Sequence, residues 1–363
     1  MAYQLYSNLA GPDDVLTKMR DFAIANGWTA LENLTQDLAI DESGTSDGYR
    51  LTLQNGDIYA NFRSANGKAI FATQNNVTTD LAHGIGLVCS TNYTSTPSSG
   101  KWYDQPNATK HVNQEVIGVG IPANATSNLN LYCNAISDPA VLLVFSLEIT
   151  KGIFQHLAVA TTQKVGAWAG GTIYSGSRNS VNMFPAAWTD MAIENESNHL
   201  FGMSSKASTF LRCDIDAAPL RTNPILWASA GPDATTLTSG CTGKILAMPV
   251  CNISTITESW FPKIPHYGYL QSQDSKDVGR NANTLNCISV NLPIALYVQR
   301  DPDALRNYSQ VGYVPGLDAI SIRNVTAGQT YEISYPNSGN LYQAFPHVKR
   351  SGGFGYDGIS IKQ

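Results

Sequence analysis

Charged side chains are scarce in this sequence of 363 residues, where Asp, Glu, Lys and Arg together make up 14%. An average soluble domain has roughly 25%. Asn, Ser, Thr, Gly and Tyr take the place of the missing charges, and they hydrogen-bond without the solvation cost that a covered ion carries. Such a surface suits permanent contact with other proteins. The alternative explanation is a β-rich chain with many polar turns, which enriches the same residues.

Basic stretches and long apolar runs are also absent. The net charge is −5, the pI is about 5.7, and Lys349-Arg350 is the only adjacent basic pair. Nothing would therefore displace counterions from phosphates, which argues against a nucleic-acid partner. No segment approaches the roughly 20 apolar residues of a membrane span. The N-terminal segment has neither the charged nor the apolar region of a signal peptide, so we expect none.

Motifs for metal binding and catalysis are missing as well. The six cysteines form no CxxC pair and no Cys/His cluster, so zinc is not expected and buried free thiols are favoured over disulfides. The chain has no GxSxG, HExxH or P-loop motif. We therefore expect no enzyme, no catalytic or metal-binding residue and no cofactor. The cysteines are Cys89, Cys133, Cys213, Cys241, Cys251 and Cys287.

Two pairs of aspartates and one histidine come closest to a chemical site. Alternation on a strand would place Asp214 and Asp216 on one face, as a calcium site or an acid/base pair requires. Neither this pair nor Asp301 and Asp303 has further ligands nearby, so turn formation and capping are favoured. His156 lies in an apolar β-prone run, where we expect a hydrogen-bonded structural residue.

The clearest strands form a hydrophobic hairpin. Residues 141–149 are a nearly continuous apolar run of strand length, Lys151-Gly152 supplies a turn, and residues 153–161 form a second β-prone run. Such runs are typical of strands that are buried on both faces or sandwiched.

One helix is predicted near the start. Pro12, Asp13 and Asp14 favour a helix entrance, an apolar stripe follows from Val15 to Ala25, and Asn26-Gly27 ends it. A sheet must cover the stripe, and we expect a small α+β module. Its predicted strands are 28–34, 49–53, 58–63 and 68–71.

The rest of the chain reads as mainly β. Residues 186–198 predict a second helix or an ordered loop, and 223–280 predict long loops around short strands. The fold class we predict is antiparallel sheets, sandwich or barrel-like, with long ordered loops and the small N-terminal α+β module. We expect domains at 1–85, 86–310 and 311–363, the last a β-meander. Its predicted strands are 319–322, 330–335, 341–347 and 358–362.

Four aromatic residues are interface candidates. Trp102 and Tyr103 belong to a Trp-Tyr-Asp-Gln-Pro segment that forms an aromatic plug or a contact, and Trp260 and Phe261 lie in a proline-rich loop. Trp and Tyr anchor interfaces, and proline-rich loops lose little entropy on docking. The alternative is that these side chains cover the edge of a core.

Several segments resemble known sequences. The block of residues 152–157, 166–171 and 174–177, which reads GIFQHL, GAWAGG and YSGS, is similar to one found in structural proteins of tailed-bacteriophage virions. Asn26-Gly27-Trp28 at the helix end, residues 59–67 and residues 102–106 also resemble that group. The resemblance covers the first half of the chain best, while 223–280 match no pattern.

The resemblance implies a non-enzymatic tail, baseplate or neck component, present in the virion and assembled in the host cytoplasm. Its expected partners are copies of itself in a cyclic homo-oligomer and other phage tail or neck proteins. One alternative is a tail fibre or spike that binds glycans on the host surface; the chain has aromatic and Asn/Asp residues for this, but no stalk repeats or heptads. The other is an enzyme that degrades polysaccharide through the aspartate pairs.

Overall fold

The computed structural model describes fifteen segments of the chain, and every structural statement below concerns these residues. They form one α-helix and two sheets, which are antiparallel at all but one strand pair, and neither sheet closes into a barrel. The fold is thus mainly β and sandwich-like, as predicted, and the barrel alternative is wrong. The described residues are 1–36, 48–66, 83–97, 100–108, 117–121, 128–179, 200–201, 209–215, 225–230, 241–249, 291–299, 308–320, 325–334, 337–346 and 358–363.

The smaller sheet has six strands and lies beside helix α1 (Pro12–Ala25). In pairing order its strands are β12 (Arg178–Asn179), β6 (Ile117–Gly120), β5 (His83–Ser90), β4 (Ile58–Asn66), β3 (Tyr49–Asn55) and β2 (Thr29–Gln36).

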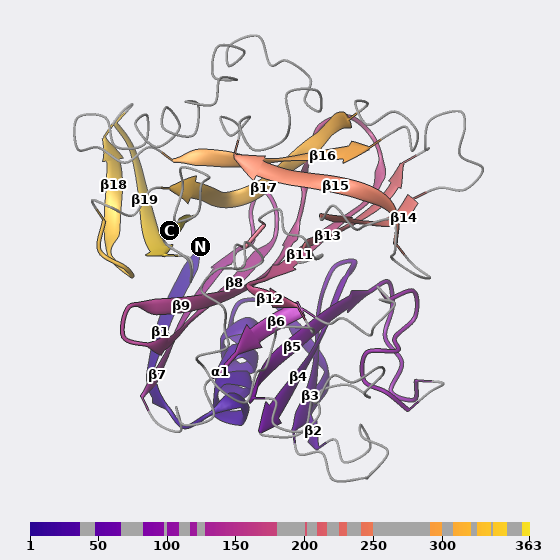
Figure 1. The fold of residues 1–363 in the computed structure, drawn as a ribbon, viewed down its shortest axis with the longest axis vertical. Helices are drawn as coiled ribbons and strands as arrows, with labels where there is room; N and C mark the ends of the chain where they lie inside the picture. The colour runs from indigo at the N-terminus through magenta and orange to yellow at the C-terminus, as the bar shows by residue number, and fades with distance from the viewer. Residues whose placement is uncertain are drawn as a thin grey trace.

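The larger sheet has fourteen strands and folds back on itself, so that its two ends lie on the same side of the molecule (Figure 1). The two chain termini lie close together there. In pairing order the strands are β1 (Ala2–Leu9), β7 (Leu129–Ile136), β8 (Leu142–Thr150), β9 (Ile153–Thr161), β11 (Ala169–Gly176), β13 (Thr209–Ile215), β14 (Ile225–Ala230), β15 (Cys241–Pro249), β16 (Leu292–Gln299), β17 (Tyr308–Ile320), β20 (Gly358–Lys362), β19 (Asn337–Pro346) and β18 (Thr330–Ser334), while β10 (Gln163–Lys164) pairs with β17 beside this path. Only β14 and β15 pair in parallel.

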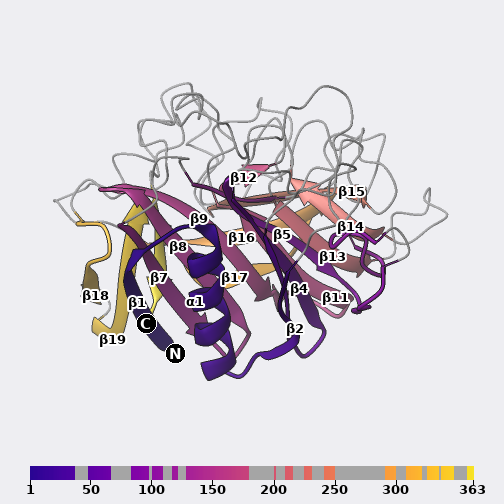
Figure 2. The ribbon, with the colours of Figure 1, turned by 90° about the horizontal axis from the view of Figure 1, so that it is seen from below.

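The fold has three layers, and strands β7, β8, β9, β11 and β13 form the middle one. Helix α1 and the six-stranded sheet cover one face of this layer and form with it a first hydrophobic core. Figure 2 shows α1 in front of the middle strands. Strands β16, β17, β19 and β20 cover the other face and form a second core. The folding back of the large sheet therefore buries both faces of its middle strands.

The central hairpin shows this double burial residue by residue. Side chains alternate along a strand, so Leu143 and Phe145 of β8 point into the first core while Leu142 and Val144 point into the second. Strand β9 alternates in the same way. Each fully buried side chain of this size contributes about 2 kcal/mol. The prediction of a hairpin buried on both faces is confirmed.

Helix α1 also follows the prediction, from Pro12 to Ala25. Pro12 occupies the first turn, where its missing N–H would have no helical partner, and Asp13 and Asp14 complement the positive end of the helix dipole. The apolar stripe is buried as far as Ala23, Ala25 at its end is exposed, and Gly27 follows the helix with a φ of 84°. The buried residues are Pro12, Val15, Leu16, Met19, Phe22 and Ala23.

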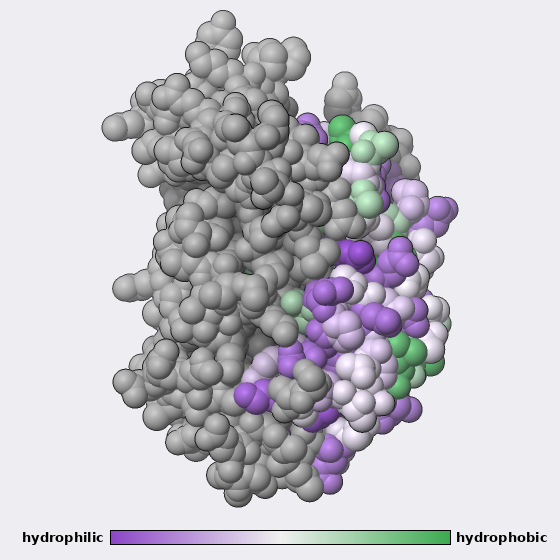
Figure 3. Space-filling view, turned by 90° about the vertical axis from the view of Figure 1, so that its right-hand side faces the viewer, coloured by the Kyte–Doolittle hydropathy of each residue, from purple (hydrophilic) through white to green (hydrophobic). Residues whose placement is uncertain are grey.

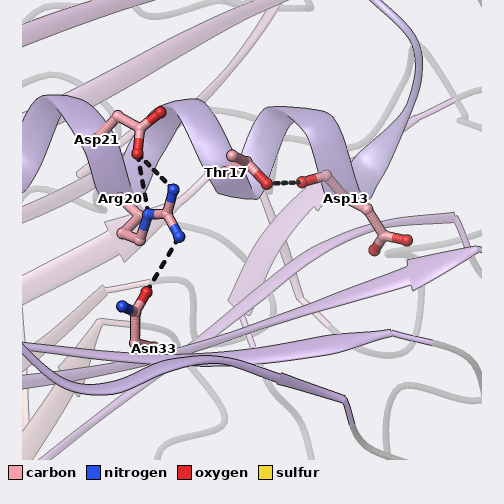
Figure 4. Close-up of polar contacts among 5 residues, drawn as sticks. All are labelled: Asp13, Thr17, Arg20, Asp21 and Asn33. Atoms are coloured by element: carbon pink, nitrogen blue, oxygen red, sulfur yellow. Dashed lines mark hydrogen bonds and ion pairs between the residues drawn. The ribbon is translucent and has the colours of Figure 1, made fainter.

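Polar contacts hold α1 in place at both ends. The Asp13 carboxylate accepts hydrogen bonds from Ser64 and Asn66 of β4. Near the other end, Arg20 binds Asp21 at 2.6 Å and reaches across to Asn33 of β2 at 3.1 Å (Figure 4). The helix is thereby fixed against two strands of the small sheet.

The N-terminal module extends beyond the segment that was predicted for it. Its helix and predicted strands 28–34, 49–53 and 58–63 are present as α1, β2, β3 and β4. The boundary expected at residue 85 falls within β5, because the sheet continues to β6 and β12, and its core continues into the middle layer. Strand 68–71 and the segment 186–198 lie outside the described residues. The predicted C-terminal strands correspond to the end of β17, β18, β19 and β20.

Candidate functional site

Trp102 packs inside the subunit. Its indole is 2% exposed and meets the Tyr103 ring edge-on, with 5.8 Å between ring centroids. The buried Gln105 side chain braces this loop, because it accepts from the Thr94 backbone N–H at 2.9 Å and donates to the Trp102 carbonyl at 3.3 Å. The burial of its indole favours the alternative that Trp102 covers the edge of a core, while its role at an interface stays a prediction. Tyr103 is half-buried, and its interface role stays a prediction.

The other sequence candidates fall largely outside the described residues. Trp260 and Phe261 do so, as do Asp216, Asp301 and Asp303. Strand β13 contains Asp214, which lies opposite Ala169 of β11. The structure therefore brings neither aspartate pair together within its described part.

His156 is fully buried where three strands meet. Its Nδ1 lies 2.9 Å from Ser146 Oγ of β8, and its Nε2 lies 2.9 Å from the Pro346 carbonyl oxygen of β19. A carbonyl can only accept, so we assign the proton to Nε2 and let Ser146 donate to Nδ1. The backbone N–H of His156 donates to Ser177 Oγ at 2.7 Å. This network joins the middle layer to β19.

The Ser146–His156 pair has the spacing of a nucleophile and its base, but not the setting. Both side chains are 0% exposed, so no substrate can reach the hydroxyl. The partner of the other ring nitrogen is a carbonyl, whereas a carboxylate would be needed there to stabilise an imidazolium. His156 is a structural residue, as the sequence predicted.

Thiols and metal ligands give no site in the described part of the chain. Cys89, Cys133 and Cys213 are free and buried, as expected, and burial raises the pKa of the Cys89 and Cys133 thiols well above the usual value. Such thiols are poor nucleophiles. Within the fifteen described segments, no three His, Cys, Asp or Glu side chains gather as metal ligands would.

Strand β1 is an unprotected sheet edge. It pairs with β7 on one side only and ends the pairing order of the large sheet. Its eight residues, AYQLYSNL, include no charge, proline or glycine. Tyr3 is 41% exposed and Leu5 is 38% exposed. Edges of this kind are normally blunted by charge or proline, because their free N–H and C=O groups can pair with another strand.

A second feature is a polar cluster on the face of the large sheet that points away from the second core. Asp318 of β17 lies directly opposite Ser360 of β20. Tyr342 of β19 pairs with Tyr331 of β18 on the same face, with 6.3 Å between ring centroids. The Tyr331 hydroxyl donates to Asn291 Oδ1 at 3.0 Å. We call these five residues the Asp318 cluster.

The environment of this cluster shifts the pKa values of Asp318 and Tyr331. Burial raises the pKa of Asp318 to about 6, although Asn291 and Lys362 oppose the shift. Burial also raises the pKa of Tyr331 to about 12. Ser360 is 0% exposed, and neither its Oγ nor the buried Nδ2 of Asn291 makes a hydrogen bond of normal geometry, although Asn291 lies close enough to lower the pKa of Asp318 and Ser360 close enough to lower that of Tyr331. Sequence reasoning missed the cluster, because its members come from strands far apart in the chain.

Comparison with known proteins adds no relative. No protein-family model matches the chain, and no curated protein matches it. Within the described residues, the helix is too short and too polar to span a membrane.

Proposed function

We propose that the chain is a structural subunit of a tailed-bacteriophage virion, in the tail, baseplate or neck, which works by assembling into a cyclic homo-oligomer. The observation that carries the assembly step is the exposed, uncharged edge strand β1. An edge strand can extend its sheet by pairing with a strand of a neighbouring copy, where main-chain hydrogen bonds supply much of the affinity. The resemblance of residues 152–177 to virion proteins supports the phage assignment.

The surface chemistry fits permanent contact. Charged residues make up only 14% of the chain, so there is little charge to desolvate when copies associate. Figure 3 shows the described part of one face as mostly polar, with apolar residues in small separate groups. Specific assembly of such a protein must depend on backbone pairing and hydrogen bonds more than on one large apolar patch.

A ring needs two different contact surfaces on each copy. We assign the second surface to β2, the free edge of the small sheet, because it is as long as β1, with eight residues each. Both edges expose a leucine to a similar degree, since Leu5 is 38% and Leu31 is 37% exposed. Strand β1 of one copy would thus pair with β2 of the next.

The test is the particle mass and shape of the purified protein, measured by analytical ultracentrifugation and electron microscopy. We expect rings for the unaltered chain and monomers for both Leu5→Lys and Leu31→Lys, because a charge on either edge opposes pairing. Ile24→Lys is the matched control, since Ile24 is 45% exposed on α1 and does not belong to either edge strand; it should leave the rings intact. A stable monomer without any substitution contradicts the proposal, and dissociation by Leu5→Lys alone contradicts the ring.

A further inference from the structure

The hairpin of β3 and β4 ends in an exposed Asn-Gly step. Asn55 pairs with Ile58, and Gly56 and Asp57 form the turn between them. Both turn residues are exposed, and Gly56 has a φ of 55°. A Cβ added at Gly56 would meet no atom within 4 Å. Solvent therefore reaches the peptide bond that follows Asn55.

An Asn-Gly step can modify itself without an enzyme. The backbone nitrogen of the glycine attacks the side-chain carbonyl carbon of the asparagine, a C–N bond forms, the C–N bond of the side-chain amide breaks, and ammonia leaves with the proton that the attacking nitrogen gives up. Water then opens the cyclic imide at either carbonyl and gives aspartate or isoaspartate. Glycine hinders the attack least, because it has no Cβ.

The chain contains three Asn-Gly steps, and the structure holds the first of them in place. The Asn26 side-chain amide donates to the Phe22 carbonyl at 2.8 Å, and the Gly27 N–H donates to the Ile24 carbonyl at 3.2 Å. Both reacting groups are thus engaged at the end of α1, and two hydrogen bonds must open before they can meet. The three steps are 26–27, 55–56 and 66–67, and the glycine of the third lies outside the described residues.

The groups at Asn55 are held more weakly. Its side-chain amide donates to the Gly27 carbonyl at 3.3 Å in an exposed position. Within the described residues, the Gly56 N–H makes no hydrogen bond. One long bond therefore retains the side chain, and the attacking nitrogen is available at the tip of the hairpin, where local opening disturbs few contacts.

We propose that Asn55 is a deamidation site of the folded protein and reacts ahead of Asn26. The product replaces an amide that donates to the Gly27 carbonyl by a carboxylate, which only accepts and repels that oxygen. Thr29, the first residue of β2, lies opposite Gln54. A negative charge thus arises beside the start of β2.

The new charge has a consequence for assembly, which rests on the proposed function. We assign β2 to pairing between copies, and charge at an edge strand opposes such pairing. Subunits that remain unassembled for long would therefore lose the ability to join a ring. The modification itself does not depend on the ring.

The site is tested on the purified full chain, which is incubated in mildly alkaline buffer made with heavy-oxygen water. Each deamidated residue takes up the label and is identified by peptide mass spectrometry. We expect Asn55 to react about 10-fold faster than Asn26 in the folded protein, because fewer hydrogen bonds must open. In urea both should react at similar rates, since both precede glycine. Asn55→Gln should abolish the label at this position and leave the rate at Asn26 unchanged.

Two results overturn the proposal. One is a reaction at Asn26 that equals or exceeds the reaction at Asn55 in the folded protein. The other is a difference between the two sites that persists in urea, because the fold would then not select the site.

Particle mass separates the modification from its consequence. Asn55→Asp, which imitates the aspartate product, should shift the protein from rings to monomers, whereas the neutral variant Asn55→Gln should keep the rings. Equal ring formation by both variants overturns the effect on assembly. If the unaltered chain forms no rings, the proposed function fails, while the label still decides whether Asn55 is modified.

Discussion

Two polar clusters in this molecule each contain a fully buried serine, but in opposite states. Around His156, both ring nitrogens have partners at 2.9 Å, and Ser146 is one of them. Around Asp318, Ser360 Oγ and Asn291 Nδ2 make no hydrogen bond of normal geometry, and the acid has a raised pKa. Satisfied networks stabilise a fold, whereas unsatisfied ones weaken it. The difference separates a group that stabilises the fold from one that weakens it.

The largest effect that would sharpen this contrast is expected at His156. Replacement by Ala removes a buried ring and leaves both Ser146 Oγ and the Pro346 carbonyl without their partner. We expect the free energy of unfolding to fall by about 3–5 kcal/mol. Urea unfolding followed by tryptophan fluorescence measures this. A loss below about 1 kcal/mol would show that the network contributes little.

The next effect distinguishes the two serines, which are equally buried at 0% exposure. Ser146→Ala leaves His156 Nδ1 unpartnered in the interior and should destabilise by about 1–3 kcal/mol. The unfolding midpoints of Ser146→Ala and Ser360→Ala are measured in the same buffer and compared. Equal losses for Ser146→Ala and Ser360→Ala would remove the contrast between the two groups.

Replacement of Asp318 is expected to raise the free energy of unfolding, and by a smaller amount than the two losses above. Its pKa is about 6 in the folded protein and 3.8 for the isolated group. Between these values the folded state binds more protons than the unfolded state, so stability falls as the pH rises and the loss is complete above about 6. Asp318→Asn should therefore gain about 1 kcal/mol at pH 7, after allowance for screening of this half-buried group.

Melting temperatures at pH 5 and pH 7 test the sign. The unaltered protein should gain stability from Asp318 on acidification, and the gap between it and Asp318→Asn should narrow at pH 5. A gap that widens on acidification would mean that Asp318 is stabilised by its surroundings.

The smallest effect is expected for Ser360→Ala. Its Oγ makes no hydrogen bond of normal geometry, so removing it leaves no new unpaired group. We expect a change within about 0.5 kcal/mol, in the direction of greater stability. Thermal unfolding by calorimetry is sensitive enough, and a loss above 1 kcal/mol would indicate that this hydroxyl has a structural role.

The elements with strong local patterns could be predicted from sequence. Helix α1 has its proline, acids and apolar stripe within fourteen residues, and the central hairpin has two apolar runs joined by Lys151-Gly152. Strand β1 escaped detection because its sequence has little apolar periodicity, and its state depends on pairing with β7. The local sequence shows the apolar periodicity of a helix or strand, but it does not show which other strand that element pairs with.

The sites were harder to predict for the same reason. Trp102 is the kind of residue that anchors interfaces, but whether it is exposed depends on the loop that Gln105 folds around it. Asp318, Tyr331, Tyr342 and Ser360 lie on four strands, so only the register of the sheet brings them together. His156 was assigned correctly, because an apolar strand already indicates burial.

The bond from His156 to Pro346 joins residues 190 positions apart. During synthesis on the ribosome, the central hairpin emerges long before β19 and β20 can cover its second face. The apolar side chains of that face are then exposed to solvent for the time needed to translate the intervening residues. Folding of this chain is therefore expected to finish late and to depend on chaperones at high expression. The hydrogen bond between His156 and Pro346 should form in the last step.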